Sequence, residues 1–390
     1  MSNVSSSNGL EKYPKLRFKG FSEPWMPSLL SDTFKKNSKK NTDGAITNVI
    51  CNSAKNGLIP QRDYFDKDIA NADNTDGYYI IEKDDFVYNP RKSSEAPYGP
   101  VSIYKYAEKG IVSPLYLCFR ALHPINAEFF DFYFKSSAWH RYIYLSGDSG
   151  ARHDRVSIRD DIFFAMPINL PSVEEQKKIS EVLVLVEKKI KAQAALVESL
   201  KKYKRGLFSA IFTRMLTIGN YPEWQQKTVA ECLSYEQPQK YIVSSENYDD
   251  SYEIPVLTAN KAFVLGYTNE THGIYNKGNV IIYDDFTMDM KYVTFSFKVK
   301  SSTIKMLTTK PGNDLYFIFA LLQSLGMQPE GHQRSYISKV EPMLISVPSY
   351  EEQLEISSFL QHYDNRLQNE ELVLNNLLNL KNGLLQKLFI

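Results

Sequence analysis

The chain has 390 residues, of which 43% are hydrophobic and 23% charged, and its formal net charge at pH 7 is +1. This composition excludes an intrinsically disordered chain, and the length predicts more than one domain. The first residues contain no apolar run typical of a signal peptide, and no run of about 18 apolar residues occurs, so we expect a cytoplasmic protein. The cysteines Cys51, Cys118 and Cys232 lack the paired spacing of a zinc site and are expected to be core thiols.

In chain order, the sequence predicts two globular regions, each followed by one long helix. The globular regions, here the first head and the second head, contain short runs of Tyr, Phe, Ile and Val that predict strands, as in 78–81, 86–88 and 280–283. Segments 127–134 and 315–322 follow Pro-Ile-Asn and Pro-Gly-Asn-Asp and predict helices. The expected division is a tail (1–23), the first head (24–170), a helix (171–213), a linker (214–220), the second head (221–347) and a second helix (348–390).

The two long helices form a tandem repeat. Residues 171–212 return 177 residues later as 348–389, and the copies begin with Pro-Ser-Val-Glu-Glu-Gln and Pro-Ser-Tyr-Glu-Glu-Gln. Ser172 and Ser349 are expected to cap the first turns, where the Glu-Glu pairs place negative charge at the positive end of the helix dipole. The repeat therefore predicts two equivalent helices that begin in the same way.

Apolar residues recur at alternating steps of four and three along both copies, which predicts the seam of a two-helix coiled coil. Residues 174–212 contain nine Lys/Arg and five Glu, a net charge of +4, whereas residues 351–389 contain three Lys/Arg and six Asp/Glu, a net charge of −3. These opposite charges favour pairing of the two helices. Residues 213–220 can span at most roughly 28 Å, whereas a 40-residue helix is roughly 60 Å long, so we expect an antiparallel pair. In such a pair Gln193 lies near Glu370, and we expect these two polar residues to set the register.

Outside the helices, the two heads match each other only near their ends. Pro24-Trp25 corresponds to Pro222-Glu223-Trp224, and the segments 155–158 and 334–338 precede the two helices at similar positions. Elsewhere the heads differ in length and residue type. Unlike heads on a duplicated scaffold suit two different ligand surfaces, whereas a duplicated enzyme usually repeats its chemistry.

With its paired Pro-Ser-x-Glu-Glu-Gln-x-x-Ile helix starts, its unlike aromatic-rich heads and the Gly/Arg segment before each helix, the chain resembles a specificity subunit of a type I restriction-modification enzyme. The resemblance covers nearly the whole chain. It implies an α+β fold in which two mixed α/β target-recognition domains are joined by two long antiparallel helices in a coiled coil, a tandem pseudo-twofold repeat. It further implies that each recognition domain reads one half of a split, asymmetric DNA site and that the helices set the spacer.

The same resemblance implies the partners. Two copies of the modification subunit, an adenine methyltransferase, are expected to dock on the helices, and restriction subunits are expected to join through them. S-adenosylmethionine, ATP and Mg are expected on those partner subunits, with no cofactor or metal in this chain. No membrane partner is expected.

Basic and amide side chains in the heads are the candidate contacts to double-stranded DNA. Lysine clusters suit phosphate neutralisation, while Arg, Asn and Gln can form paired hydrogen bonds with base edges. A Gly-led polar turn, 150–153 and 331–334, recurs just before each helix, whereas the lysine run at 35–40 is equally consistent with a solvated loop. The candidates are Lys35, Lys36, Lys39, Lys40, Arg62, Asn89, Arg91, Lys92, Arg152, His153, Arg155, Lys291, His332, Gln333 and Arg334.

Some apolar residues on the helices have no place in a two-helix seam. They are candidates for the surface that binds the modification subunit, and packing inside the fold is the alternative. These residues are Leu185, Leu196, Phe208, Leu372 and Leu378.

Two other functions remain alternatives. An adenine methyltransferase needs an Asn/Asp-Pro-Pro-aromatic turn, and the segment that begins with Asn89-Pro90 lacks the second proline and the aromatic residue. Carboxylate pairs such as Asp284-Asp285 are isolated, and the histidines show no ligand spacing, so catalysis by this chain is disfavoured. A coiled-coil scaffold that binds only protein explains the helices but not the unlike heads, and salt-sensitive binding of duplex DNA separates this alternative from the first.

Overall fold

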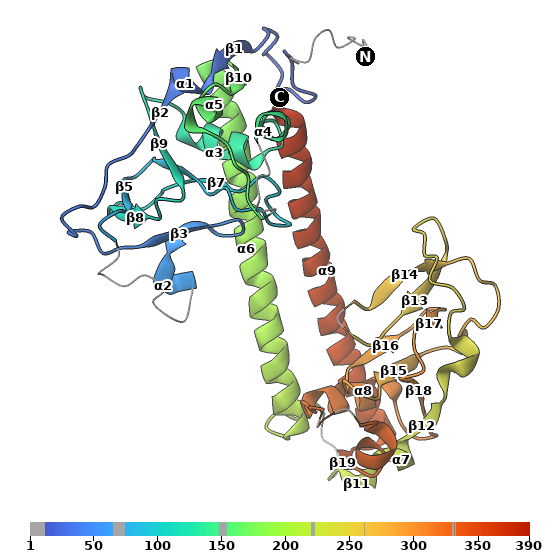
Figure 1. Cartoon of the computed structure of the whole chain (residues 1–390). Helices are drawn as coiled ribbons and strands as arrows, with labels where there is room; N and C mark the ends of the chain where they lie inside the picture. The colour runs from blue at the N-terminus through green and yellow to red at the C-terminus, as the bar shows by residue number, and fades with distance from the viewer. Residues whose placement is uncertain are drawn as a thin grey trace. The chain divides into compact units, whose positions relative to one another are not determined.

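The computed structural model describes residues 12–64, 75–147, 154–219, 223–260, 262–329, 331 and 333–390. It divides into two compact units, Met1–Gln193 with Val373–Ile390, and Ala194–Leu372. The boundaries fall within both long helices, α6 (Val173–Phe212) and α9 (Tyr350–Leu388), so each unit contains one head and a part of each helix (Figure 1). The two long helices predicted from the repeat are therefore confirmed, and each helix is divided between the two units.

The first head is built on a four-stranded antiparallel sheet in the order β2-β9-β6-β7. Its central strand β6 pairs with both neighbours, Phe86 lying opposite Phe119 on one side and Ile103 on the other. The elements are β1 (Met26–Leu29), α1 (Leu30–Thr33), β2 (Phe34–Lys36), β3 (Ile50–Ser53), β4 (Gly57–Pro60), α2 (Gln61–Tyr64), β5 (Tyr79–Ile81), β6 (Phe86–Tyr88), β7 (Val101–Ile103), β8 (Gly110–Val112), β9 (Leu117–Ala121), α3 (Ala127–Lys135), α4 (His140–Ser146), α5 (Asp160–Phe164) and β10 (Pro167–Leu170).

The second head contains the equivalent antiparallel sheet in the order β12-β18-β15-β16. Its central strand β15 is buried along its whole length, as expected for a Val-Ile-Ile-Tyr run. The elements are β11 (Gln225–Thr228), α7 (Val229–Cys232), β12 (Leu233–Glu236), η2 (Pro238–Tyr241), β13 (Ile254–Leu257), β14 (Val264–Thr268), β15 (Val280–Asp284), β16 (Met290–Val293), β17 (Lys298–Val299), β18 (Ile304–Thr309), α8 (Leu315–Ser324), η3 (Tyr336–Val340) and β19 (Leu344–Val347).

The main elements of the two heads are connected in the same order. A first strand pairs antiparallel with the strand that leads into the long helix, β1 with β10 and β11 with β19. The four-stranded sheets then correspond strand for strand, and one helix follows each sheet, α3 or α8. In both, the residue before the helix caps it: Asn126 accepts a hydrogen bond from the Phe129 amide, and Asp314 accepts one from the Phe317 amide. The predicted tandem repeat is therefore confirmed in the heads, beyond the segments that match in sequence.

The two helix starts show why the repeated Ser-x-x-Glu-Gln pattern is needed. The Ser172 hydroxyl accepts a hydrogen bond from the Glu175 amide at 3.2 Å, and the Ser349 hydroxyl accepts one from the Glu352 amide at 3.3 Å. The glutamine that follows turns back to the carbonyl of the first proline, at 3.1 Å for Gln176. The second copy forms the same bond at 3.0 Å. These bonds satisfy donors and acceptors that the first helical turn leaves free.

The second glutamate of each pattern is buried and anchors its head. Glu175 receives two hydrogen bonds of 2.8 Å from the guanidinium of Arg17, and Glu352 receives one of 3.0 Å from the indole N–H of Trp224. Arg17 hydrogen-bonds in a fork geometry, the strongest form of charged pairing available to it. The start of each scaffold helix is thus tied to the segment that leads into its own head.

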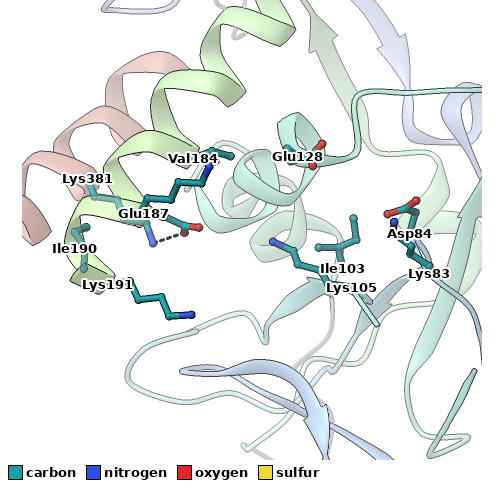
Figure 2. Close-up of a pocket in the computed structure, with 11 residues that line it drawn as sticks. Lys83, Asp84, Ile103, Lys105, Glu128, Val184, Glu187, Ile190, Lys191 and Lys381 are labelled. Carbon is teal, nitrogen blue, oxygen red and sulfur yellow. Dashed lines mark hydrogen bonds and ion pairs between the residues drawn. The ribbon is translucent and has the colours of Figure 1, made fainter. Parts of the chain in front are cut away.

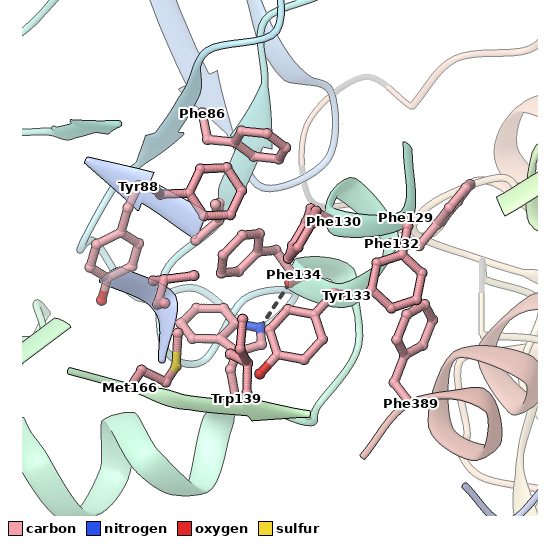
Figure 3. Close-up of a cluster of buried hydrophobic side chains, with 14 of the residues drawn as sticks. Phe86, Tyr88, Phe129, Phe130, Phe132, Tyr133, Phe134, Trp139, Met166 and Phe389 are labelled. Carbon is pink, nitrogen blue, oxygen red and sulfur yellow. Dashed lines mark hydrogen bonds between the residues drawn. The ribbon is translucent and has the colours of Figure 1, made fainter. Parts of the chain in front are cut away.

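An aromatic core fills the first unit (Figure 3). Six consecutive residues of α3, from Phe129 to Phe134, are buried, because the sheet, α4 and the long helices enclose this helix from several sides. Phe389, just beyond α9, packs its ring 5.4 Å from that of Phe129 and 6.2 Å from that of Tyr133. The indole N–H of Trp139 donates to the Phe134 carbonyl at 2.9 Å. The last residues of the chain are therefore part of the first head's core.

Within each unit the long helices pair in opposite directions. In the first unit Ile179 and Leu183 near the start of α6 share a core with Leu385 and Leu388 near the end of α9. In the second unit the end of α6 shares a core with the start of α9, as shown by Ile211 and Leu360. The antiparallel pairing is therefore confirmed, while the register role of Gln193 and Glu370 stays a prediction.

The cysteines fit the expectation of unpaired thiols. Cys118 and Cys232 are buried within apolar clusters, and Cys51 is half-buried. Burial raises the pKa of the Cys51 thiol, which keeps it protonated and poorly reactive. Among the helices in the described ranges, none is long and apolar enough to cross a membrane.

Candidate nucleic-acid interface

In the first head, four of the candidate residues lie together where the central strand ends. After β6 the chain continues through Asn89, Arg91 and Lys92, and this segment pairs with the segment that precedes α5. Arg91 and Arg155 form an isolated antiparallel bridge, the Lys92 amide donates to the Asp154 carbonyl at 2.8 Å, and the Val156 amide donates to the Pro90 carbonyl at 2.9 Å. The structure thus joins the two basic segments that the sequence singled out separately.

The loop that carries Arg91 is held in shape by hydrogen bonds of the Asn89 side chain and by a close backbone approach at Gly99. The Asn89 side chain donates to the Asn52 carbonyl at 3.1 Å and accepts from the Arg91 amide at 3.1 Å. At the other end of the loop, Gly99 has φ +82, and a Cβ there would lie only 2.1 Å from the Asn89 carbonyl oxygen. Only glycine fits this close approach. Asn89 therefore shapes the loop, and its role in contacting DNA stays a prediction.

The basic side chains at this junction differ in exposure. Arg91 is exposed, whereas Lys92 and Arg155 are half-buried. The nearest acid to the Arg155 guanidinium is Asp154, at 3.9 Å. An exposed guanidinium on a rigid loop is the group best suited to pair with a guanine edge. The predicted contacts Arg152 and His153 lie outside the described residues.

The lysine run of the first head is only partly a loop. Lys35 and Lys36 belong to the edge strand β2, and Lys39 and Lys40 follow it with exposed side chains. The Lys36 ammonium lies 2.6 Å from Asp160, and the hydrogen bond to that carboxylate raises the pKa of Lys36. An edge strand that carries lysines also resists pairing with another sheet, so both functions suit this run. Arg62 is exposed on the short helix α2.

The second head has an equivalent junction at the end of β15. Asp285, directly after this strand, is 1% exposed, and its side chain accepts a hydrogen bond of 2.9 Å from the Tyr336 amide. Its carbonyl accepts from the Ser335 amide at 2.9 Å and from the Ser335 hydroxyl at 2.7 Å. The Tyr283 hydroxyl pairs with the same hydroxyl at 2.7 Å, and burial raises the pKa of Tyr283 to about 12. The turn before η3 is thus fixed to the end of the central strand.

Two cations face the second oxygen of Asp285. Lys305, only 2% exposed, lies 3.4 Å away, and the guanidinium of Arg334 lies 3.8 Å away. Neither cation forms a hydrogen bond with this oxygen, so both are held to Asp285 by ionic attraction. Because Lys305 is closer and buried, Arg334, which is 53% exposed, is the cation that can turn outward to a ligand. The adjacent Gln333 is exposed, and His332 lies outside the described residues.

Lys291 occupies a different part of the second head. It lies on the edge strand β16 opposite Ile282 and is half-buried. It therefore does not belong to the turn that carries Arg334. Its proposed contact with DNA stays a prediction, as do those of the lysines on β2.

Four of the five predicted partner-surface residues are exposed. The exposed fractions are 56% for Leu185, 38% for Leu196, 58% for Leu372 and 40% for Leu378. Phe208 is the exception, because only 5% of it is exposed and it lies in the core of the second unit. The Lys204 ammonium lies 4.8 Å from its ring centroid, and the Phe212 ring lies 6.1 Å away. The assignment of Phe208 to a partner surface is wrong, because the head packs on a helix face that a two-helix seam leaves open.

Among the described residues, no three His, Cys, Asp or Glu side chains gather in a way that could hold a metal ion. Comparison with known proteins then decides the family. The model of the type I restriction modification DNA specificity domain matches residues 23–202 and 221–379, which include both heads and most of both helices. The chain belongs to this family. Specificity subunits of this family are non-catalytic.

Individual relatives agree with this family. The chain is 48% identical over 126 residues to the type I restriction enzyme EcoR124I/EcoR124II specificity subunit of Escherichia coli, and the match spans 31% of each chain. The similarity thus spans about a third of the length of that relative. Two solved structures share the fold: the S subunit of a type I restriction-modification system from M. genitalium (15% identity, TM-score 0.63, 97% of this chain and 99% of that chain), and a chain from a type I R-M system (12% identity, TM-score 0.54, 94% and 97%).

Proposed function

We propose that this specificity-family chain selects the DNA sequence on which a type I restriction-modification complex acts. Each head reads one half of a bipartite, asymmetric site in double-stranded DNA. The observation that carries the proposal is the repeated junction, in which each head joins the segment after its central strand to the segment before its long helix. Each junction carries one exposed arginine, Arg91 directly after β6 in the first head and Arg334 before η3 in the second. The two turns differ in residues, as expected for two different half-sites.

The long helices are proposed to set the spacer between the half-sites. A helix of 40 residues such as α6 is about 60 Å long, which exceeds the roughly 34–36 Å of one turn of DNA. The helices are also proposed to dock two modification subunits through exposed leucines such as Leu185 and Leu372, and restriction subunits through them. The catalytic chemistry, adenine methylation with S-adenosylmethionine and ATP- and Mg-dependent cleavage, is proposed to belong to those partner subunits.

Selection from a random duplex library tests this function. The chain would be assembled with its modification subunit and incubated with duplexes of random sequence, and the bound DNA would be sequenced. We expect two short fixed blocks separated by a constant number of unspecified base pairs. We also expect affinity to fall steeply as salt rises, because basic side chains that contact phosphates release counterions.

The alternative is a coiled-coil scaffold that binds only protein. It predicts normal assembly with the modification subunit but no enrichment of any sequence and no salt-sensitive binding of duplex DNA. An assembled complex with that behaviour would refute the proposed function.

A further inference from the structure

One acidic residue in the helix pair of the first unit joins three elements. Glu187 on α6 accepts a hydrogen bond of 2.7 Å from Lys381 on α9 and one of 3.3 Å from Lys135 on α3. The pair of Glu187 and Lys381 lies on the wall of a pocket of about 590 Å³ between the head and the helices of this unit (Figure 2). Glu187 therefore connects both scaffold helices to the first head.

The connection continues into the sheet of the first head. Asp131 on α3, whose side chain is 3% exposed, receives Lys135 at 3.1 Å and Lys105 at 2.9 Å. Lys105 follows strand β7 closely. Five alternating charges thus run from the edge of the sheet through α3 to α6 and α9.

The repeat places an acid at the same position in the second unit. Residue 187 plus the repeat length of 177 is 364, and Asp364 on α9 lies 2.7 Å from Lys204 on α6. Residue 204 plus 177 is 381, so the two ion pairs are equivalent with the helices exchanged. The Tyr316 hydroxyl on α8 donates to Asp364, as Lys135 on the equivalent helix donates to Glu187. We call Glu187 and Asp364 the seam acids.

The second unit also connects its seam acid to the sheet, with aromatic groups in place of charges. The Tyr316 ring meets the Tyr292 ring of β16 edge-on, with centroids 5.1 Å apart at 87°. The Tyr292 hydroxyl accepts a hydrogen bond of 2.9 Å from Asn279. Because β7 and β16 hold the same place in their sheets, the two connections link the same elements by different chemistry.

The protonation states keep both connections intact near neutral pH. Burial opposes the charge of Glu187, but Lys135 and Lys381 outweigh it and lower the pKa of this carboxyl. Burial, and then the hydrogen bond to Asp364, raise the pKa of the Tyr316 hydroxyl above its ordinary range. Glu187 is therefore a charged acceptor for its lysines, and the Tyr316 hydroxyl stays protonated and donates to Asp364.

We propose that Glu187 and Asp364 are positioning residues that fix the orientation of each head on the two helices of its unit and so restrict the complex to one spacer length. The inference rests on the proposed function. The Glu187 side chain is 31% exposed and that of Asp364 is 17% exposed. Partly exposed ion pairs contribute little to the free energy of unfolding, so stabilisation alone does not explain an acid at these positions. Polar groups within a largely apolar helix contact are instead well suited to specify one arrangement among several.

The test compares the methylation rates of duplexes that carry the native spacer and spacers one base pair longer or shorter. The variants are Glu187→Gln, Asp364→Asn and Tyr316→Phe, all in the complex with the modification subunit. Tyr316→Phe removes one hydroxyl and keeps the ring, so folding is preserved. The matched controls are Glu181→Gln and Glu198→Gln, because each of these acids pairs with a lysine of its own helix, at 4.0 Å to Lys177 and 3.4 Å to Lys201.

We expect each variant of a seam acid, and Tyr316→Phe, to lower the preference for the native spacer by about threefold to tenfold. This is the change expected when one interaction between two neighbouring side chains is lost. Both half-sites and complex assembly stay as they are, and the controls keep the native preference. An unchanged preference in the variants, or an equal loss in the controls, overturns the inference. If the unaltered complex recognises no split site, the proposed function fails, and the two failures are thereby distinguished.

Discussion

The buried carboxylate of Asp285 is expected to be far more important for stability than an exposed carboxylate in a shorter ion pair. In Asp285→Asn the side chain can still accept a hydrogen bond from the Tyr336 amide, but Lys305, which is 2% exposed, loses its counter-charge. The Tyr235 ring, 5.1 Å from the Lys305 ammonium, does not replace that charge. Breaking a buried pair in this way costs roughly 3–5 kcal/mol. Because the Arg334 partner is exposed and contributes little, we expect the lower end, about 3 kcal/mol.

The matched control is Asp160→Asn in the first head. Asp160 lies only 2.6 Å from Lys36, but their side chains are 47% and 42% exposed, so the expected loss is below about 1 kcal/mol. The two variants are therefore expected to differ in lost stability because Asp285 is buried and Asp160 is exposed, although the ion pair of Asp160 is shorter. Calorimetric unfolding of the two variants measures it directly.

For a unit of roughly 150–250 residues, 1 kcal/mol shifts Tm by about 2–4 °C, so Asp285→Asn should lower the Tm of the second unit by roughly 6–12 °C. The same variant removes the carboxylate charge that attracts Arg334 and should therefore alter recognition of one half-site. If Asp285→Asn lowers Tm by no more than Asp160→Asn, the reasoning from burial is refuted.

Three further predictions follow from single residues. Arg91→Ala should relax one half-site by a factor of roughly 5–150 and leave the other unchanged in a binding selection, whereas an equal loss on all sequences would make Arg91 a phosphate contact. Phe389→Ala should lower the unfolding free energy of the first unit by about 3–5 kcal/mol in urea titrations, and a loss no larger than that of the exposed Leu378→Ala would contradict its place in the core. His140 packs against the rings of Trp139 and Tyr98, and burial lowers its pKa; since the unfolded chain then binds a proton more readily, the first unit should lose stability as pH falls below about 6.5. Urea titrations at pH 7.5 and 5.5 check this, and His140→Gln should reduce the pH dependence.

The sequence predicted those parts of the fold that rest on local pattern. The Pro-Ser-x-Glu-Glu-Gln starts and the apolar steps along the helices are local, and both helices begin and end within a few residues of the expected places. The strands at 86–88 and 280–284 were visible because β-branched and aromatic residues cluster there. The duplication extended these assignments from one head to the other.

Contacts between distant residues escaped the sequence. Arg17 and Glu175 are 158 residues apart, and nothing in either segment indicates the other. Asp131 is buried on α3 and pairs with two lysines, a position that its local sequence does not indicate. Phe208 was misassigned because a two-helix pattern shows only which face meets the other helix, while a head covers a further face of the same helix.

The candidate DNA contacts were partly predictable. The Gly-led turns predicted before each helix end at or just before Arg155 and Arg334, but the attachment of these segments to the ends of β6 and β15 required the fold. Asn89 matched a base-reading residue type, yet its amide is used to shape its own loop. Residue type identifies candidates, and the hydrogen-bond partners separate supporting groups from free ones.

The most direct test of the central claim is a map of methylated bases in a methylation-free host that expresses this chain with its modification subunit. Single-molecule sequencing of the genome would locate every modified adenine. The account predicts one split, asymmetric motif that is absent when this chain is omitted. A soluble, assembled complex that adds no methylation, or adds it without this chain, would contradict the account.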